Sequence, residues 1–251
     1  MPKALITGAS GGIGLELARV FAREGYALVL VARSEKRLQE LAAELKTETV
    51  VIANDLTRPG AAQEVFEQVR QVDVLVNNAG FGSSGKFVEA PLDEQLGMMQ
   101  LNMTALVALT GLFLPAMVKA KSGRIMNVAS TAAFQPGPLM ATYYATKAFV
   151  LSFSEAIHEE LSGSGVTVTA LCPGATETGF VERANMNDAR LFKAKKPMAA
   201  RAVAEAGYRG MLAGKAIVIP GLMNSLMAQS VRVSPRSVVR KIARHLNDRV
   251  K

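Results

Sequence analysis

The 251-residue sequence contains one cysteine, Cys172, two histidines and no tryptophan. A single cysteine excludes an internal disulfide. With so few cysteines and histidines, no cluster has the spacing of zinc ligands, and we expect no metal site. The first residues, "MPKALITGAS", lack the apolar run behind a basic head that marks a secretory signal. We therefore expect a cytoplasmic protein.

An excess of one charge sign is found mainly at the carboxyl end of the chain. The formal net charge is +8, but the excess lies mainly in residues 232–251, where seven basic residues accompany one acid, Asp248. The rest of the chain is near balance, which argues against a nucleic-acid surface across the domain. The basic residues of this tail are Arg232, Arg236, Arg240, Lys241, Arg244, Arg249 and Lys251.

The same tail has the pattern of an amphipathic helix. Ser234 and Pro235 resemble an N-cap followed by proline at the first helical position. A basic amphipathic helix can lie on a membrane surface, but such a stripe more often packs on its own domain, which is the interpretation we favour. The predicted apolar stripe consists of Val238, Val239, Ile242 and Leu246.

One long segment lacks charge altogether, from Gln95 to Val118, and it is long enough to raise the question of a membrane span. Polar side chains interrupt it, and Pro115 lies near its end, so we expect a buried helix instead. The interrupting residues are Gln95, Gln100, Asn102, Thr104 and Thr110.

Apolar runs and amphipathic segments alternate along the whole chain. Strands are expected at 3–7, 26–32, 48–55, 73–80, 123–130 and 165–174, with a weaker one at 216–221. Helices are expected at 13–23, 34–46, 97–120 and 141–162. This alternation predicts an α/β fold with a parallel sheet covered on both faces. No linker interrupts it, so we expect one domain over 1–231 and a separate tail over 232–251.

A glycine-rich stretch, "TGASGGIG" at 7–14, lies where the first strand becomes the first helix. Glycine permits a positive φ and lets a phosphate approach the backbone. The following helix offers free N–H groups and the positive end of its dipole to an anion. Gly8, Gly12 and Gly14 therefore indicate a nucleotide-phosphate site.

Two adjacent tyrosines precede a lysine in "YYATKAFVLSF" at 143–153. Tyr143 and Tyr144 both lie within a helical turn of Lys147. A free phenol has a pKa of about 10. A nearby ammonium favours the phenolate, so a tyrosine beside Lys147 is expected to have a lower pKa and to exchange its proton more easily. The spacing alone leaves open which tyrosine reacts.

Taken together, TGxxxGxG, "NNAG" at 77–80, Ser130 and Tyr143-x-x-x-Lys147 resemble the short-chain dehydrogenase/reductase family over roughly residues 3–180. The resemblance implies a Rossmann-type, doubly wound sheet of about seven strands. It also implies an oxidoreductase that transfers a hydride between NADP(H) and a small-molecule carbonyl or secondary alcohol. Two alternatives stay open: a nucleotide-binding regulator without activity, and a dehydratase or epimerase that recycles its cofactor.

The family pattern also assigns the chemical roles. Its catalytic tyrosine lies four residues before the lysine, which makes Tyr143 the acid–base residue and leaves Tyr144 to packing or substrate contact. Ser130 is expected to bind the substrate oxygen. Lys147 is expected to bind the nicotinamide ribose, and Asn102 to hold a water near it.

The resemblance places the cofactor along the carboxyl ends of the strands. Gly8, Ser10, Gly12, Ile13 and Gly14 are expected at the phosphates, Asp55 and Leu56 at the adenine, Asn78, Ala79 and Gly80 at the ribose, and Pro173, Gly174, Thr176 and Thr178 at the nicotinamide. NADP(H) is preferred over NAD(H), which stays possible, because the position where NAD-specific members carry an acid holds Ala32, followed by Arg33.

Family members form dimers or tetramers through their two long helices, so we expect a homodimer or homotetramer here. The loop near 178–197 is expected to close over the substrate. Its apolar residues Met186, Leu191 and Phe192 would suit an apolar or acyl-like substrate.

Overall fold

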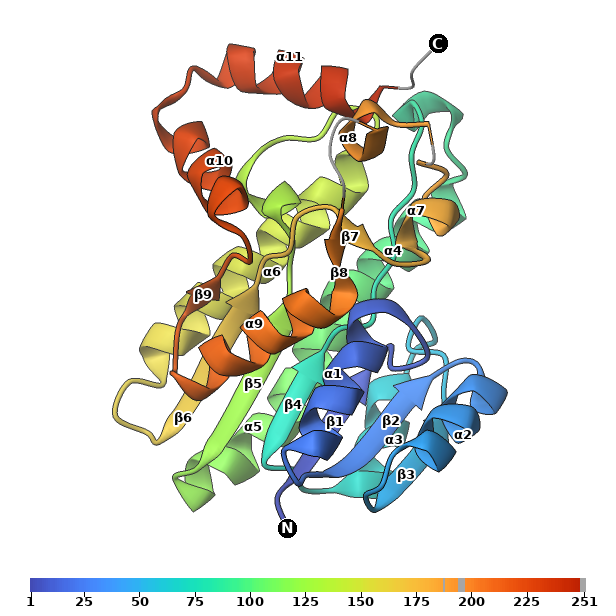
Figure 1. The fold of residues 1–251 in the computed structure, drawn as a ribbon, viewed down its shortest axis with the longest axis vertical. Helices are drawn as coiled ribbons and strands as arrows, with labels where there is room; N and C mark the ends of the chain where they lie inside the picture. Colours follow the sequence, from blue (N-terminus) through green and yellow to red (C-terminus); the bar gives the residue numbers. More distant parts are fainter. Residues whose placement is uncertain (187, 194–196, 249–251) are drawn as a thin grey trace.

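A computed structural model describes residues 1–186, 188–193 and 197–248 (Figure 1). Its centre is a parallel sheet of seven strands in the order β3-β2-β1-β4-β5-β6-β9. This confirms the predicted Rossmann-type fold, with the order reversing between β1 and β4. The strands are β1 (Lys3–Thr7), β2 (Ala27–Ala32), β3 (Thr49–Ala53), β4 (Val74–Asn77), β5 (Gly123–Val128), β6 (Val166–Leu171) and β9 (Ile217–Val218).

Helices cover both faces of this sheet. One face packs against α1 (Gly12–Arg23), α2 (Glu35–Glu44) and α9 (Ala200–Leu212). The other packs against α3 (Ala61–Val69), α5 (Leu106–Ala120) and α6 (Ala141–Glu160). Side chains alternate between the faces because the strand period is two, so Ala4 and Ile6 of β1 point to α1 while Leu5 points to α5.

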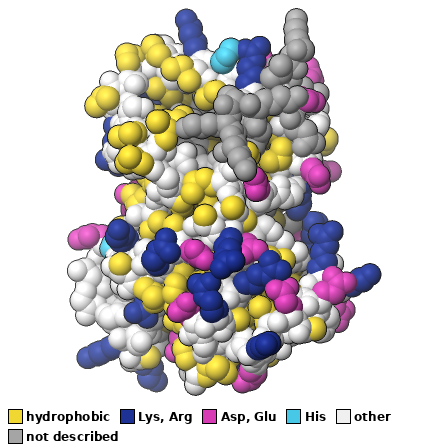
Figure 2. Space-filling view, in the orientation of Figure 1, with side chains coloured by type: hydrophobic (Ala, Val, Ile, Leu, Met, Phe, Trp, Pro, Cys, Tyr) yellow, Lys and Arg dark blue, Asp and Glu magenta, His cyan; other side chains and the backbone are white. Residues whose placement is uncertain are grey.

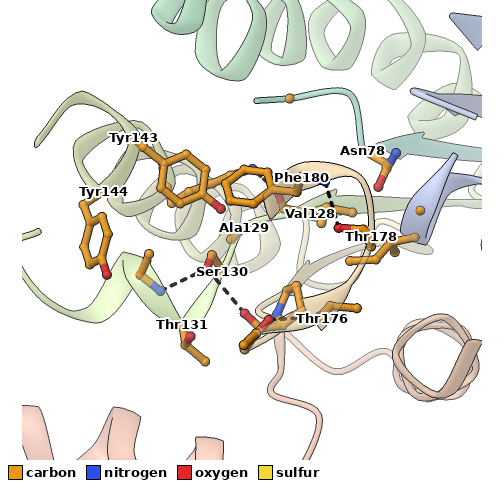
Figure 3. Close-up of a pocket in the computed structure, with 18 of the residues that line it drawn as sticks. Asn78, Val128, Ala129, Ser130, Thr131, Tyr143, Tyr144, Thr176, Thr178 and Phe180 are labelled. Carbon is orange, nitrogen blue, oxygen red and sulfur yellow. Dashed lines mark hydrogen bonds between the residues drawn. The ribbon is translucent and has the colours of Figure 1, made fainter. Parts of the chain in front are cut away.

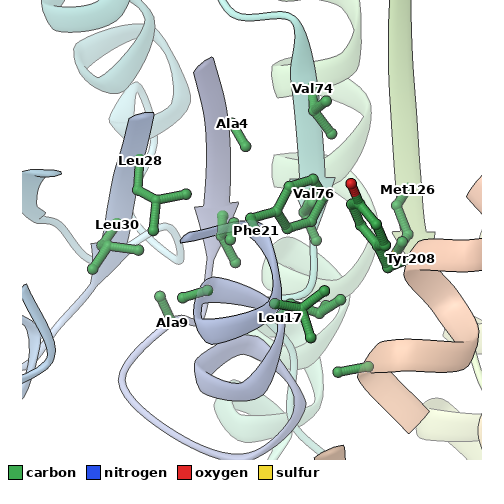
Figure 4. Packing of buried hydrophobic residues seen from close by; sticks show 14 of the residues in the cluster. Ala4, Ala9, Leu17, Phe21, Leu28, Leu30, Val74, Val76, Met126 and Tyr208 are labelled. Atoms are coloured by element: carbon green, nitrogen blue, oxygen red, sulfur yellow. The ribbon is translucent and has the colours of Figure 1, made fainter. Parts of the chain in front are cut away.

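Aromatic rings fix the packing of α1 and α9 on the sheet (Figure 4). Phe21 of α1 meets Tyr208 of α9 edge-to-face at 5.1 Å between ring centroids, and meets Tyr26 in the same way at 5.0 Å. Edge-to-face rings add attraction beyond their buried area. The amino-terminal half that carries the glycine turn is therefore held firmly to the carboxyl-terminal half.

The long uncharged segment is a helix of the core, as predicted. It begins at Leu92, earlier than the expected residue 97, because Pro91 precedes it and acids in the first turn favour the helix dipole. In order it comprises α4 (Leu92–Met99), a π-helical turn (Gln100–Ala105) and α5. By length and composition it could cross a membrane, yet its polar residues Asn102 and Thr110 are buried inside the domain.

Several predicted strands end sooner than expected. Residues 78–80 leave the sheet after Asn77 instead of continuing β4, because their backbone turns along the carboxyl edge of the sheet. The weak strand at 216–221 shrinks to Ile217–Val218. A separate two-stranded ribbon joins β7 (Thr176–Glu177) to β8 (Met198–Ala199).

The remaining helices lie beyond the carboxyl edge of the sheet. They are the short α7 (Phe180–Arg183) and α8 (Arg190–Lys193), and the longer α10 (Leu222–Val233) and α11 (Arg236–Asn247) (Figure 1). The predicted boundary at residue 231 falls within α10, and the division of the chain there stays a prediction. Arg249 and Lys251 of the tail lie outside the described residues.

Two details of the predicted tail helix are wrong. Pro235, not Ser234, occupies the N-cap position of α11, and the Ser234 hydroxyl instead donates to the Ser230 carbonyl at 2.7 Å. The buried residues of α11 are Val239, Ala243 and Asn247. Val238 and Ile242 of the predicted stripe are exposed. The reason is that α11 contacts the domain through residues spaced four apart, beginning at Val239, which lie on one side of the helix.

Candidate active site

A cavity of about 1490 Å³ runs along the carboxyl edge of the sheet. One part is lined by the turns after β1, β2 and β4, and the other by the end of β5, by α6 and by α10–α11. Single small-molecule sites commonly measure ~300–1,000 Å³. The cavity is therefore large enough for a dinucleotide together with a second molecule.

The glycine turn and the "NNAG" segment clamp each other at one side of this cavity. Gly8 has φ +66°, and a Cβ there would come within 2.9 Å of the Ala79 Cα. The Thr7 hydroxyl accepts hydrogen bonds from the Asn78 and Ala79 amides, both at 3.0 Å. The Asn78 side chain in turn donates to the Thr7 carbonyl at 2.8 Å. Asn78 and Thr7 thus hold the glycine turn in place, and the motifs had assigned no role to Thr7.

This turn has the features that a dinucleotide phosphate requires. Gly12 also has a positive φ, +56°, and lies against the Thr178 side chain. α1 is a full helix of twelve residues whose first turn has no side-chain cap, and its first residues Gly12 and Ile13 line the cavity. Bare helix amino termini bind phosphates through their free amides. Ser10 and Ile13 line the same surface, and Gly14 packs so closely on Asn78 and Gly8 that no side chain would fit.

The end of the cavity that was predicted to hold the adenosine is lined by Arg33, Arg37, Asp55 and Leu56. Asp55 accepts hydrogen bonds from the Thr57 amide at 3.0 Å and the Thr57 hydroxyl at 2.8 Å. Burial favours its protonated form, but those bonds and the nearby Arg33 guanidinium outweigh it and lower the pKa of Asp55. Arg33 is exposed and points to the same end, where Ala32 offers no competing carboxylate.

Arg183 of α7 approaches this end from the opposite wall, and the motif analysis did not find it. Its guanidinium carbon lies 4.2 Å from the centroid of the Phe81 ring. Burial lowers the pKa of Arg183, and the neighbouring positive charge of Arg33 lowers it further. Arg33 and Arg183 both line the cavity, and two guanidinium groups that repel each other can attract an anion. The only signal in the sequence was an arginine in the expected substrate loop.

The residues expected to carry the chemistry meet in the other part of the cavity (Figure 3). Tyr143 points toward Ser130, and its ring packs 5.1 Å from that of Phe180. The Ser130 hydroxyl donates to the Pro173 carbonyl at 3.3 Å and accepts from the Ala132 amide at 3.1 Å. Lys147 is buried, and its ammonium nitrogen lies 5.8 Å from the centroid of the Tyr143 ring.

One electrostatic expectation from the sequence is wrong. Burial raises the pKa of Tyr143 above its ordinary value, although a side-chain hydrogen bond to Ser130 acts in the opposite direction. Lys147 does not lower it, because the ammonium donates to the Val128 carbonyl at 2.7 Å instead. Burial also lowers the pKa of Lys147 to about 8. Tyr143 is therefore held as the neutral phenol, the form that can donate a proton.

Asn102 lies in the π-helical turn, and its side chain is fully engaged. Its Oδ1 accepts from the Phe81 amide at 3.1 Å, while its amide donates to the Phe81 carbonyl and the Thr146 hydroxyl, both at 3.0 Å. A Cβ built on Gly80 would lie 2.9 Å from Asn102 Oδ1 and 3.5 Å from Lys147 Nζ. Asn102 is thus next to Lys147, and its side chain holds the loop after β4. π-turns frequently occur at functional sites.

The segment after β6 forms the floor between the two parts. Pro173, Gly174, Thr176 and Thr178 all line the cavity, as predicted for the nicotinamide end. A Cβ on Gly174 would come within 2.6 Å of Asn224, so α10 packs directly over this segment. Asn224 is a further residue that the motif analysis did not assign.

The wall opposite the cofactor side is apolar and comes from distant segments. Tyr144 is buried, and its hydroxyl donates to Asn247 Oδ1 at 3.1 Å, which brings α11 over the cavity. Leu191 lines the cavity as expected, while the Phe192 side chain lies outside the described residues. The other apolar lining residues of this wall include Met140, Met186, Met223, Met227, Val239, Ile242 and Leu246.

The sequence matches the family model described as short chain dehydrogenase over residues 2–189. A solved short-chain dehydrogenase from Sphingobium yanoikuyae in complex with NADPH is 35% identical, with 95% of each chain covered and a TM-score of 0.85. The bulky-bulky ketone specific alcohol dehydrogenase from Comamonas testosteroni is 33% identical, with 94% of this chain and 95% of that chain covered and a TM-score of 0.78. The ketoacyl reductase HetN of Nostoc sp. is 34% identical over 184 residues, which is 70% of this chain and 64% of HetN.

Proposed function

The chain belongs to the short-chain dehydrogenase/reductase family of NAD(P)-dependent oxidoreductases, and we propose that it reduces the carbonyl group of an apolar substrate with NADPH. The observation that carries the proposal is the convergence of Ser130, Tyr143 and Lys147 where the phosphate-binding half of the cavity meets its apolar half. Membership of an enzyme family sets aside the alternative of a nucleotide-binding regulator.

The proposed chemistry assigns one task to each side chain. The nicotinamide, when bound, supplies the hydride. Ser130 holds the substrate carbonyl oxygen with its hydroxyl and stabilises the charge that develops there. Tyr143 donates its phenolic proton to that oxygen. Burial raises the pKa of Tyr143, so its side chain is the neutral phenol at neutral pH and has a proton to give.

Lys147 and Asn102 support the proton donor in this proposal. Lys147 would turn from the Val128 carbonyl toward the ribose hydroxyls of the cofactor and bring its positive charge closer to Tyr143. An ammonium near a phenol favours the phenolate that remains after proton transfer. Asn102 fixes the loop that forms one wall of this space through its hydrogen bonds to Phe81.

The preference for NADPH over NADH rests on charge at the adenosine end. Arg33, Arg37 and Arg183 line that end of the cavity, and Ala32 occupies the position of the ribose-binding acid. Arginine binds phosphate through a planar, permanently charged fork. The related Sphingobium yanoikuyae structure contains NADPH. NADH remains a weaker alternative cofactor.

The substrate class is proposed from the apolar wall. Methionine, leucine and valine side chains surround the space beyond Tyr143, which suits a ketone with bulky apolar groups or an acyl chain. The Comamonas testosteroni relative is described as specific for bulky-bulky ketones, and HetN as a ketoacyl reductase. Both descriptions are consistent with a large apolar carbonyl compound here.

We also propose a cytoplasmic homodimer or homotetramer formed through α5 and α6. Apolar side chains on these helices are exposed, among them Val107, Val118 and Phe149. Phe149 stacks on Phe153 with ring centroids 5.8 Å apart, which forms a flat apolar surface. Such a surface on a large domain is suited to self-association.

The proposal is tested by following NADPH oxidation with a panel of bulky ketones and acyl-like ketones. Tyr143→Phe should lower turnover by roughly 100-fold or more, since proton transfer contributes about that much, while NADPH binding is kept. A dehydratase or epimerase would convert substrate without net NADPH consumption. No NADPH oxidation with any carbonyl compound, or full activity of Tyr143→Phe, would contradict the proposal.

A further inference from the structure

Large apolar side chains are exposed on the last two helices. Leu222 is 79% exposed and Ile242 is 55% exposed. Figure 2 shows hydrophobic side chains gathered where Figure 1 places α10 and α11. We call this surface the α10–α11 face, and it consists of Leu222, Met223, Leu226, Met227, Val238 and Ile242.

The spacing of these residues makes a continuous face. Leu222, Met223, Leu226 and Met227 recur at i, i+1, i+4 and i+5, so they occupy one side of α10, and the buried residue of that helix is Ala228. On α11 the domain is contacted by Val239, Ala243 and Asn247. Val238 and Ile242 lie beside that line and are not covered by it.

The charged side chains that α10 and α11 carry all have the same sign. No acidic residue occurs between Glu205 and Asp248 in the sequence. The exposed basic residues of the two helices are Arg232, Arg236, Arg240, Lys241 and Arg244. Apolar side chains beside a dense set of arginines and lysines are the pattern of helices that lie in the interface of a membrane.

We propose that the α10–α11 face docks on the surface of an anionic lipid membrane. The apolar residues would enter the boundary between headgroups and acyl chains, while the basic residues contact lipid phosphates. A second copy of this chain fits less well, because a symmetric interface would bring two strongly basic surfaces together. A nucleic acid would use the charges but leave the exposed leucines and methionines without a partner.

The α10–α11 face lies next to the opening of the cavity, so docking would affect how a substrate enters. Met223, Met227 and Ile242 are exposed on the α10–α11 face and also line the cavity. The face therefore forms a rim of the apolar part of the cavity. Docking would hold this rim against the bilayer, where a lipid-soluble compound could enter without crossing water.

The test is vesicle flotation of the full chain, without cofactor or substrate, so its outcome does not depend on the proposed reaction. Vesicles of phosphatidylcholine alone are compared with vesicles containing phosphatidylglycerol. We expect the protein to float with the anionic vesicles only, and at least fivefold less protein to float when the salt concentration is raised to 0.5 M.

Two matched pairs of variants locate the binding surface. Leu226→Glu/Val238→Glu changes two exposed residues of the face that do not line the cavity, and Val50→Glu/Val88→Glu makes the same changes elsewhere. In the second pair, the double variant Arg240→Glu/Lys241→Glu reverses two basic charges next to the face. Its control, Lys119→Glu/Lys215→Glu, reverses two basic charges elsewhere. The first member of each pair should lose flotation at least fivefold and the second should keep it.

NADPH titration shows whether each variant is folded, because these positions lie outside the cofactor site. Wild-type protein that does not float with anionic vesicles overturns the proposal, as does equal flotation by both members of a pair. Loss of self-association in Leu226→Glu/Val238→Glu, with no vesicle binding by the wild type, would assign the face to a second copy of the chain instead.

Discussion

The Tyr144 hydroxyl donates a hydrogen bond to Oδ1 of Asn247, 103 residues further along the chain, at a distance of 3.1 Å. The Asn247 amide donates to the Pro138 carbonyl at 3.0 Å, so α11 is fastened to both α6 and the loop before it. The two adjacent tyrosines thus have different surroundings. Tyr143 faces Ser130, while Tyr144 holds α11, the helix that covers the apolar part of the cavity.

Replacing Tyr144 by phenylalanine should reduce stability and leave the chemistry largely intact. The change leaves Asn247 Oδ1 buried without a donor, at a cost of about 1–3 kcal/mol in the free energy of unfolding. Urea unfolding measures this loss, and NADPH titration should show unchanged affinity. Asn247→Leu should lose more, because it also removes the hydrogen bond to the Pro138 carbonyl. The double variant should lose little more than Asn247→Leu alone, because both changes break the hydrogen bond between Tyr144 and Asn247. A turnover as low as that of Tyr143→Phe would show that Tyr144 takes part in proton transfer.

Replacing Arg33 by alanine should weaken NADPH binding much more than NADH binding. Loss of a charged hydrogen bond to the 2′-phosphate is expected to cost roughly 1.5–3 kcal/mol. Fluorescence titration of both cofactors against both proteins measures the difference. Lys36→Ala is the control, since Lys36 is an exposed residue of α2 that does not line the cavity. Equal affinity of the unmodified protein for NADH and NADPH would refute the assignment.

Arg183→Ala should also weaken NADPH binding, by roughly 10- to 150-fold for one charged hydrogen bond. The guanidinium lies over Phe81 and close to Arg33, so a bound phosphate would relieve the repulsion between the two arginines. Arg183→Lys should recover part of the affinity by restoring the charge. Glu182→Ala, at the neighbouring position of α7, is the control. Unchanged NADPH affinity in Arg183→Ala would mean that Arg183 serves only to pack on Phe81.

Lys147 should make the stability of the cofactor-free protein depend on pH. Burial lowers its pKa from 10.5 to about 8. Below about pH 8 the lysine is charged in both the folded and the unfolded chain, so the cost of burying the charge is fully present. As the pH rises from about 8 toward 10, the folded lysine loses its proton while the unfolded lysine keeps it, and the cost is relieved.

The measurement compares the free energy of unfolding of Lys147→Met with that of the wild type. The variant should gain most over the wild type at pH 7.5, and its advantage should shrink by pH 10, because only the wild type is relieved of the buried charge. Lys119→Met, which removes an exposed lysine, is the control for the loss of a basic side chain. A constant difference for Lys147→Met would mean that Lys147 is not deprotonated in the folded chain over this range.

The fold followed from the sequence because its signals are local. Buried parallel strands appear as short apolar runs, and the glycine turn at Gly8 and Gly12 needs positive φ angles that only glycine adopts freely. Strand order could be expected from the family resemblance, and the structure has it. The element ends were less predictable, as at Asn77, because they depend on which backbone groups find partners in the neighbouring strands.

Contacts between segments far apart in the chain were decided only by the tertiary structure. Neither spacing nor composition pairs Tyr144 with Asn247, or Arg183 with Phe81, since both pairs depend on how α7 and α11 return over the sheet. The same holds for the pKa of Tyr143. A lysine four residues away predicted a lower pKa for Tyr143, but burial raises that pKa. The ammonium of Lys147 does not offset the rise, since it is directed at the Val128 carbonyl. Sequence spacing brings charges close along a helix, while their direction and their access to water are set by packing.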